Sequence, residues 1–372
     1  MNYQRTTQLT TLFMLVLALV MGCGGPATTT TATLPAPTSS TPTLAIIPTA
    51  ATVLSSTPVP TQPRAIVIDT DMAVDDWMAI LYLLQRADVK VMAITVTGTG
   101  EAHCAPGILH ALGLVALSGQ DKIPVACGRE TPLQGSHAFP DGWRARVDSL
   151  LGLTLPKGQD AASTLAAVEL LTSVIQSSPD KLTLLALGPL TNVAEAIQSD
   201  PALVDNIERI YIMGGAVNVP GNVGASRVNI DNNVAEWNIY VDPQAANVVF
   251  HSGAPITLVP LDATNQVPLT IEFLDEFKSK HTSPEATFVF DMLTKQRQFI
   301  AAGYYFWDPL AAAILTNEDL ATYQNNNLCV VENEGPESGW TKSGEGCPQI
   351  RVAVSADAGR FKQIFLDTLN AP

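Results

Sequence analysis

The sequence predicts an α/β fold, in which an open, mostly parallel twisted sheet is covered by helices on both faces. From Arg64 onward, short runs rich in Val, Ile and Leu alternate with longer segments of helical periodicity. The strand-like runs are almost continuously apolar, which is typical of parallel strands that are buried on both faces. Neither an internal repeat nor a second change of composition interrupts residues 64–372, so we expect one catalytic or binding domain there.

The expected elements follow one another in a regular order. Strands are predicted at residues 65–69, 89–96, 182–187, 207–213, 256–259 and 350–354. Helical segments follow the first three of these strands, at residues 75–85, 104–117 and 191–198. In open sheets of this kind ligands bind beyond the carboxyl ends of the strands. Residues that directly follow a strand are therefore the first candidates for a site.

Residues 1–22 resemble the signal peptide of a bacterial lipoprotein. A short basic start leads into an apolar run that ends just before Cys23. A transmembrane anchor is the alternative, but the run from Leu12 to Met21 is shorter than the roughly 20 apolar residues that span a bilayer. We expect cleavage before Cys23 and lipidation of its thiol. The protein would then be extracytoplasmic and bound to the bacterial membrane through this lipid.

Residues 23–63 are predicted to form a disordered tether. They consist mainly of Thr, Pro, Ala and Ser, with almost no charged or aromatic side chains. Such a segment cannot bury enough apolar surface to offset the entropy of ordering the chain. The net charge of the whole protein is -15. Since nucleic-acid binding depends on clustered Lys and Arg, this charge argues against a nucleic-acid partner.

The cysteines indicate a disulfide. The chain has 5 cysteines, and lipidation of Cys23 leaves an even number in a compartment that permits disulfides. Cys329 and Cys347 bracket a Gly-, Glu- and Ser-rich stretch between two strand-like runs, so we predict a hairpin whose loop they close. Cys104 and Cys127 are either bridged to each other or buried as free thiols.

A dense group of carboxylates follows the first predicted strand. These residues are Asp69, Asp71, Asp75 and Asp76. One Asp is enough to cap a helix. Four carboxylates repel one another, and a divalent cation that prefers oxygen ligands relieves that repulsion. The alternative is an ordinary capped helix beside a solvated acidic loop.

This segment resembles the signature of the inosine-uridine nucleoside hydrolase family, Asp-x-Asp-Pro-Gly-x-Asp-Asp, with Met72 and Ala73 in the places of Pro and Gly. Further segments resemble the family's motifs in the expected order. They are Leu187-Gly188-Pro189-Leu190-Thr191-Asn192, then Met213-Gly214-Gly215 leading to Glu236-Trp237-Asn238, and finally Trp307-Asp308-Pro309-Leu310. The resemblance implies a Rossmann-like nucleoside hydrolase fold and hydrolysis of the N-glycosidic bond of ribonucleosides. It also implies a homodimer or homotetramer.

The resemblance further implies that Ca²⁺ is the cofactor. Carried over by position, the ligands of the ion are the carboxylates of Asp71, Asp76 and Asp308 and the backbone carbonyl of Leu187. Asp71 is also implied to be the general base. Three carboxylates and a carbonyl suit calcium, which accepts six to eight oxygen ligands with loose geometry.

The same comparison implies which residues hold the sugar. Asp75 and Asn238 match the residues that bind the 2′ and 3′ hydroxyls, and Glu236 and Asn222 match those that bind the 5′ hydroxyl. Asn222 has a simpler interpretation as a turn residue. The true equivalents at this position could also be Asn232 or Asn233, because the connection is longer than usual. Glu101, at the end of the second predicted strand, is a further candidate.

The leaving base is where the sequence departs most from the family. Many members carry His where this chain has Trp307, and an indole cannot give up a proton near neutral pH. The resemblance is therefore closest to purine-preferring members, in which indoles sandwich the purine. Trp143 is the candidate partner, although it could equally pack on the surface of the core. His137 is the alternative, as a mobile acid from the same loop.

Two other functions remain open at this stage. Few Lys or Arg lie near the motifs, since none occurs between Ala65 and Gln85, and this favours an uncharged nucleoside over a nucleotide. A lipid-anchored nucleoside-binding protein without turnover would share the anchor, the tether and an acidic pocket. The changes at Met72, Ala73 and Trp307 could also mark a relative that acts on another ribosyl compound.

Overall fold

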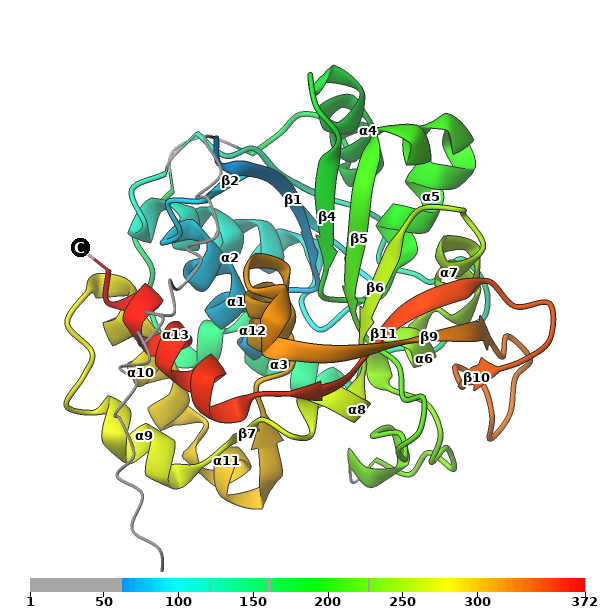
Figure 1. The fold of residues 1–372 in the computed structure, drawn as a ribbon. Coiled ribbons are helices and arrows are strands. Elements are labelled where there is room, and N and C mark those ends of the chain that lie inside the picture. The colour runs from blue at the N-terminus through cyan, green and yellow to red at the C-terminus, as the bar shows by residue number, and fades with distance from the viewer. Residues whose placement is uncertain (1–61, 121, 159–161, 227, 372) are drawn as a thin grey trace, which may run out of the picture. The chain divides into compact units, whose positions relative to one another are not determined.

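A nine-stranded sheet forms the centre of the protein in the computed structural model, with the strand order β10-β9-β11-β6-β5-β4-β1-β2-β3 (Figure 1). The structure describes residues 62–371 except 121, 159–161 and 227. The strands of this sheet are β1 (Arg64–Thr70), β2 (Val89–Val96), β3 (Val125–Cys127), β4 (Leu182–Ala186), β5 (Ile207–Met213), β6 (Ile256–Val259), β9 (Ala321–Val330), β10 (Thr341–Ser343) and β11 (Gln349–Ala356). A separate two-stranded sheet pairs β7 (Pro268–Leu269) with β8 (Tyr304–Tyr305).

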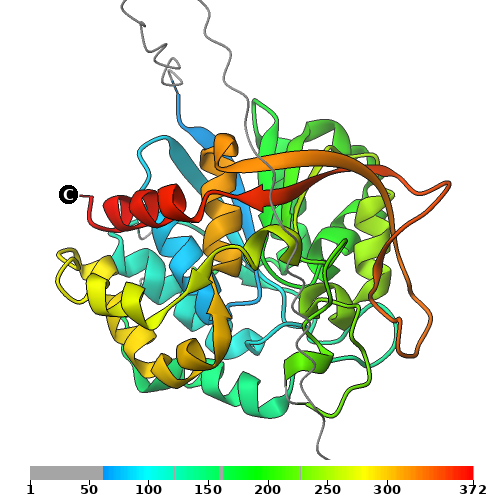
Figure 2. The ribbon, with the colours of Figure 1, turned by 60° about the horizontal axis from the view of Figure 1, so that its bottom comes forward.

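Helices cover both faces of the main sheet. They are α1 (Val74–Leu84), α2 (Cys104–Leu117), α3 (Asp141–Asp148), α4 (Ala167–Ser177), α5 (Thr191–Ser199), α6 (Trp237–Val241), α7 (Pro243–Phe250), α8 (Leu261–Thr264), α9 (Ile271–Phe277), α10 (Pro284–Lys295), α11 (Arg297–Gly303), α12 (Trp307–Thr316) and α13 (Ala358–Leu369). On one face α1 packs against α2, α10, α12 and α13, while α4, α5 and α7 line the other (Figures 1 and 2). Among these helices, none combines the length and the apolar character needed to cross a bilayer.

The strands are buried on both faces, as their apolar sequences predict. In β1, Ile66 and Ile68 join the hydrophobic core under α1, whereas Val67 between them joins the core under α4 and α5. Tyr211 and Ile212 of β5 divide between the two cores in the same way. This alternation explains why these strands show an unbroken apolar run rather than an apolar–polar pattern. The predicted fold class is confirmed.

Three strands of the main sheet, β3, β9 and the three-residue β10, escape the apolar pattern. β3 has only three residues, and β9 contains the polar run Gln324–Asn327, whose side chains are mostly exposed. β9 pairs antiparallel with both β11 and β10, whereas the neighbouring strands β11, β6, β5, β4, β1, β2 and β3 pair in parallel. An antiparallel strand near a sheet edge can face water, so its sequence does not need the apolar run that we used to find strands.

The strand order places a switch point beside β1. The chain runs from β1 to β2 and β3 on one side, and then returns to lay β4 against the other side of β1. Asp69 of β1 and Ala186 of β4 are paired in register, so the carboxyl ends of these two strands lie next to each other. In doubly wound sheets this is where ligands bind.

Two disulfides join the described cysteines. Cys329 and Cys347 are bonded, with their Cα atoms 5.3 Å apart, so this predicted pair is present. Cys104 and Cys127 are also bonded, with a Cα separation of 5.5 Å. The signal peptide, Cys23 and almost the whole of the predicted tether lie outside the described residues.

Candidate functional site

The four carboxylates at the end of β1 and the start of α1 are buried rather than solvated. Asp69 lies within β1, Asp71 directly follows the strand, and Asp75 and Asp76 lie in the first turn of α1. Asp71 is 2% exposed and Asp76 is fully buried. A solvated acidic loop is therefore excluded. Burial of so many carboxylates at one place is costly unless something compensates their charge.

Asp308 joins this group although it lies far from the other carboxylates in the sequence. It occupies the first turn of α12, which packs against α1 and so brings the two acidic turns together. One carboxylate oxygen from each of Asp75, Asp76 and Asp308 lies within 4.8 Å of the others. The second oxygen of Asp76, Oδ2, is buried and has no hydrogen-bond partner in the described part of the chain. Such an orphaned oxygen is an open ligand position.

The protonation of these side chains shows the same need for a positive charge. Burial, followed by repulsion from Asp71, raises the pKa of Asp75 to about 7. Burial and the neighbouring carboxylates also raise the pKa of Asp76 and of Asp308 well above the ordinary range of an aspartate. A divalent cation among them would favour the charged carboxylates and so offset both effects. An all-oxygen set of this kind fits a hard ion such as calcium.

Asp71 is held in place from both sides by backbone groups. Its Oδ1 accepts a hydrogen bond from the Ala73 amide at 3.1 Å, and its Oδ2 accepts one from the Glu101 amide at 3.2 Å. Gly100 and Gly188 both lie against its side chain, and a Cβ added at Gly188 would be 2.6 Å from the Cβ of Asp71. Any side chain at either glycine would displace the carboxylate.

The predicted metal ligands are thus not all equivalent in the structure. The tight group contains Asp75 in addition to the predicted Asp76 and Asp308, and it does not contain Asp71. The charge of Asp71 nevertheless acts on all three carboxyl groups and raises their pKa. Asp71 therefore lies beside the group of three, where it has backbone partners of its own.

Leu187 directly follows β4, and its amide donates a 2.8 Å hydrogen bond to the carbonyl of Asp69. Its own carbonyl accepts a hydrogen bond from the side-chain amide of Asn238 at 2.9 Å. The Asn238 amide also donates to the Met213 carbonyl at 3.3 Å. Asn238 therefore fixes the ends of both β4 and β5, while its side-chain oxygen has no donor among the described residues.

Glu236 is the N-terminal cap of α6. Its carboxylate accepts hydrogen bonds from the amides of Gly215, Asn238 and Ile239, at 2.9, 2.9 and 3.3 Å. Burial raises its pKa to about 7 despite these donors. Gly215 reaches this position with φ +82, a conformation that favours glycine.

Asn222 contacts the backbone directly after Glu236. Its Oδ1 accepts a 3.1 Å hydrogen bond from the amide of Trp237, the residue after Glu236. Asn232 is buried and its side chain bonds the amides of Val234 and Ala235, so it supports its own loop. The neighbouring Asn233 is exposed.

The aromatic candidates lie in two separate groups. Trp307 contacts Tyr304 and Tyr305, with ring centroids 4.6 and 5.7 Å apart. Trp143 packs against Trp237 at 5.3 Å, within a small hydrophobic cluster. Among the described aromatic contacts, none joins Trp143 to Trp307.

His137 is not a free loop acid in this structure. Its Nδ1 lies 2.8 Å from the carbonyl of Tyr240, and its Nε2 lies 2.9 Å from a carboxylate oxygen of Glu334. The imidazole also stacks on the Tyr240 ring, with centroids 4.0 Å apart. Both ring nitrogens are engaged, so this conformation uses His137 to join two loops.

Sequence reasoning missed Arg144, which is buried beside the carboxylates. One guanidinium nitrogen donates to the carbonyls of Gly98 and Ala102, at 2.9 and 3.4 Å. Burial raises the pKa of both Asp71 and Glu101, and the charge of Arg144 acts in the opposite direction on each. Nothing in the local sequence distinguishes this arginine, because its role depends on α3 packing over the loop after β2.

Three further polar residues support the carboxylates. The hydroxyl of Thr95 and the side-chain amide of Asn192 donate to Asp69, at 2.6 and 2.8 Å. The hydroxyl of Tyr304 donates to Asp75 at 3.5 Å. Asn192 could have been found, because it ends the motif that begins at Leu187.

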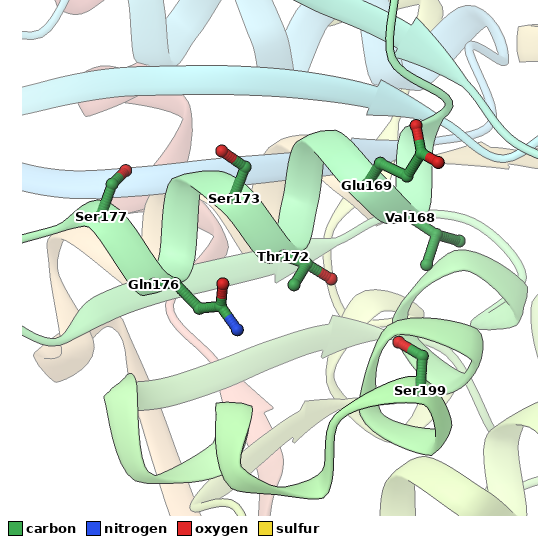
Figure 3. A pocket seen from close by; sticks show the side chains of 7 residues that line it. All are labelled: Val168, Glu169, Thr172, Ser173, Gln176, Ser177 and Ser199. Carbon is green, nitrogen blue, oxygen red and sulfur yellow. The ribbon is translucent and has the colours of Figure 1, made fainter.

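A surface groove lies elsewhere on the described part of the protein. It is an open groove of about 620 Å³ (Figure 3). Its lining comes from α4 and the end of α5, namely Val168, Glu169, Thr172, Ser173, Gln176, Ser177 and Ser199. None of the predicted site residues lines it, so this groove does not mark the site. The buried carboxylates do.

Comparisons with known proteins agree with this geometry. Residues 66–363 match the family model described as inosine-uridine preferring nucleoside hydrolase. The chain is 34% identical over 289 residues to uridine nucleosidase 1 of Arabidopsis thaliana, covering 76% of this chain and 82% of that protein. It is also 34% identical over 263 residues to a pyrimidine-specific ribonucleoside hydrolase of Citrobacter koseri, covering 69% and 80%. A purine-preferring ribonucleoside hydrolase from Gardnerella vaginalis superposes with a TM-score of 0.71 at 27% identity, covering 82% and 98%.

Proposed function

Because the chain belongs to the inosine-uridine preferring nucleoside hydrolase family, we propose that it hydrolyses the N-glycosidic bond of ribonucleosides, releasing the free base and ribose, with calcium as its cofactor. The observation that carries the proposal is the buried group of Asp75, Asp76 and Asp308 at the switch point of the sheet, next to Asp71. A protein that only binds nucleosides would share an acidic pocket, but it would not need a general base beside a metal-held water.

Calcium would be held by Asp71, Asp76, Asp308 and the Leu187 carbonyl, and the position of Asp75 makes it a further oxygen ligand. A bound calcium ion supplies positive charge that draws oxygen ligands together and makes water easier to deprotonate. The orphaned Oδ2 of Asp76 and the raised pKa of Asp76 and Asp308 support a cation at this place.

Asp71 is proposed to be the general base. Its two oxygens each accept a single backbone hydrogen bond, which leaves each with capacity to accept the proton of a water molecule. The sugar develops positive charge as the C–N bond breaks. The surrounding carboxylates supply a negative field for that charge. Asp75 and Asn238 would orient the 2′ and 3′ hydroxyls, and Glu236 and Asn222 the 5′ hydroxyl.

Purine nucleosides are the proposed preferred substrates. Trp307 stands where an acid for the leaving base is usual, and it lies beside Tyr304, which itself reaches Asp75. This places an aromatic pair next to the carboxylates, on which an extended base could stack. Trp143 and Glu101 are proposed as further contacts. The likeness to the Gardnerella vaginalis enzyme supports this preference.

Pyrimidine nucleosides are the second candidate. The proteins from Arabidopsis thaliana and Citrobacter koseri are named for uridine and for pyrimidines, and both are 34% identical to this chain over their matched regions. Direct comparison of inosine with uridine decides between the two.

The proposal includes a location and an assembly. The signal-like start and Cys23 support a lipid-anchored, extracytoplasmic enzyme. Membership of the family leads us to expect a homodimer or homotetramer, which sedimentation of the purified protein would measure.

The deciding experiment is a substrate panel. Purified protein is incubated with inosine, guanosine, uridine and cytidine, with EDTA and again after calcium is restored, and base and ribose are quantified. We expect release of both products, loss of turnover in EDTA, and recovery with calcium. Binding without product release would indicate the nucleoside-binding alternative, and unchanged turnover by metal-free protein would reject the metal.

A further inference from the structure

A loop between β9 and β10 packs against the segment that carries Glu236. We call residues Val331–Trp340 the clasp. The Val331 amide donates to the Trp340 carbonyl at 3.0 Å, and the Gly339 amide donates to the Val331 carbonyl at 2.8 Å, so the loop is closed at its base. Just outside this base, the disulfide between Cys329 and Cys347 ties β9 to the chain that leaves β10. In Figures 1 and 2 this part of the chain (orange) extends beyond the edge of the sheet.

The clasp is built into the segment that leads to Glu236. The carbonyl of Ser338 accepts a 2.7 Å hydrogen bond from the side-chain amide of Asn232. Trp340 forms an antiparallel bridge with Ala235, the residue before Glu236. Gly339 then lies directly on α6, because a Cβ added there would be 2.7 Å from the Cα of Tyr240.

The clasp also reaches two other segments of the site. Glu334 lies 2.9 Å from Nε2 of His137, whose other ring nitrogen contacts the Tyr240 carbonyl. Thr341, directly after the clasp, lies against Gly215, where an added Cβ would be 2.8 Å from its hydroxyl. Gly215 is one of the three residues whose amides hold the Glu236 carboxylate.

Glu236 therefore depends on backbone that the clasp supports on two sides. One side is Gly215 at the end of β5, and the other is the start of α6. We propose that the clasp, held by the Cys329–Cys347 disulfide, is a positioning element that aims Glu236 at the 5′ hydroxyl of the nucleoside and so sets how tightly the sugar is bound. The inference rests on the proposed function, in which Glu236 binds that hydroxyl.

A matched pair of glycine variants tests the proposal. Gly339 and Gly346 both have a left-handed backbone, with φ +80 and φ +81. Alanine at either position carries the same conformational strain. Only at Gly339 does the new Cβ meet another segment, since nothing lies within 4 Å of a Cβ at Gly346. Gly339→Ala should therefore push the clasp off α6, while Gly346→Ala controls for strain.

The readouts separate positioning from a general loss of structure. With inosine, Gly339→Ala and the double variant Cys329→Ser with Cys347→Ser should raise KM roughly tenfold, with kcat within about threefold of the parent protein. With 5′-deoxyinosine, which lacks the hydroxyl in question, the KM of these variants should match that of the parent. Gly346→Ala should behave like the parent on both substrates.

A second measurement does not depend on turnover. Hydrogen exchange at the amides of Gly215, Asn238 and Ile239, which donate to Glu236, should be faster in Gly339→Ala and unchanged in Gly346→Ala. Equal increases in KM on inosine and 5′-deoxyinosine, or unchanged exchange at these amides, would overturn the proposal. If the parent protein hydrolyses no nucleoside, the proposed function fails, and the exchange experiment still decides whether the clasp holds Glu236.

Discussion

The side-chain amide of Asn238 donates a 2.9 Å hydrogen bond to the backbone carbonyl of Leu187. The sequence comparison assigns one of these residues to the sugar and the other to the metal, and the structure joins them. The carbonyl oxygen has a second lone pair. It can therefore keep this hydrogen bond and still face a cation, with its direction fixed by Asn238.

Asn238→Ala should accordingly weaken the binding of calcium and the binding of the nucleoside together. Loss of the amide frees the Leu187 carbonyl, so we expect the calcium concentration for half-maximal activity and the KM for inosine each to rise about tenfold. A calcium titration of turnover measures the first effect. A normal calcium requirement combined with a raised KM would show that Asn238 acts on the sugar alone.

Asp71→Asn should remove the proposed base while keeping the shape of the side chain. We expect kcat to fall by roughly a thousandfold or more, because the amide cannot accept the proton of water. In EDTA, thermal unfolding should occur at the parent temperature or above it, since a buried charge is removed. A variant that unfolds at a lower temperature than the parent, and whose loss of activity only matches its loss of folded protein, would argue against a catalytic role.

The stability of the metal-free protein should increase as the pH falls. Burial raises the pKa of Asp69, Asp75 and Glu236 to about 7 each, above the values of 3.8 and 4.5 that these groups have when unperturbed. The folded state therefore holds protons that the unfolded state releases. This stabilisation is complete below about pH 4 and is lost as the pH rises through 7.

The measurement is thermal unfolding in EDTA at pH 8 and at pH 6, with calcium-loaded protein as the control. We expect a higher melting temperature at pH 6 without metal and a smaller or opposite difference with calcium, because the ion favours the charged carboxylates. A metal-free protein that is more stable at pH 8 would contradict the burial of these groups.

Trp307→Ala tests how the base departs. If the indole assists by stacking on the purine, turnover of inosine should fall more than turnover of p-nitrophenyl riboside, whose leaving group needs no protonation. The parent protein should also cleave inosine far faster than uridine. Equal losses on both substrates would show that Trp307 only shapes the pocket, and equal rates for inosine and uridine would reject the purine preference.

Cys23→Ser should release the protein from the membrane. A thiol placed directly after a short apolar run and a small residue is positioned for lipidation, and the serine hydroxyl cannot form the thioether. Detergent-phase partitioning of cells that express the parent or the variant measures the change. Partitioning that is the same for both proteins would count against the anchor.

The sequence was most informative where one residue type follows from one physical requirement. Buried parallel strands require continuous apolar runs, and each of the six predicted strands overlaps a strand of the main sheet. The acidic cluster was also visible, because Asp71, Asp75 and Asp76 are close in the chain. Its last member, Asp308, required the family resemblance, since only the packing of α12 on α1 brings it near.

Residues that act through tertiary packing left little trace in the sequence. Arg144 serves the site only because α3 lies over the loop after β2. Gly100 and Gly188 look like ordinary turn residues in the sequence. Both must be glycine because the side chain of Asp71 fills the space that a Cβ at either position would occupy. At Met72, by contrast, the departure from the family signature was visible in the sequence and the backbone explains it. Its φ is 58. A proline ring fixes φ near −65°, so this backbone excludes the proline that the signature has there.

The position of β1 inside the sheet, between β4 and β2, constrains how the protein folds. β1 is the first strand of the described residues. Its partner β2 begins at Val89, whereas the partner on its other edge, β4, begins only at Leu182. Until then the chain carries an unpaired, strongly apolar strand edge, the kind of surface on which chains aggregate. Pairing across such sequence separations is slow. We therefore expect refolding to be slow and its yield to fall steeply with protein concentration.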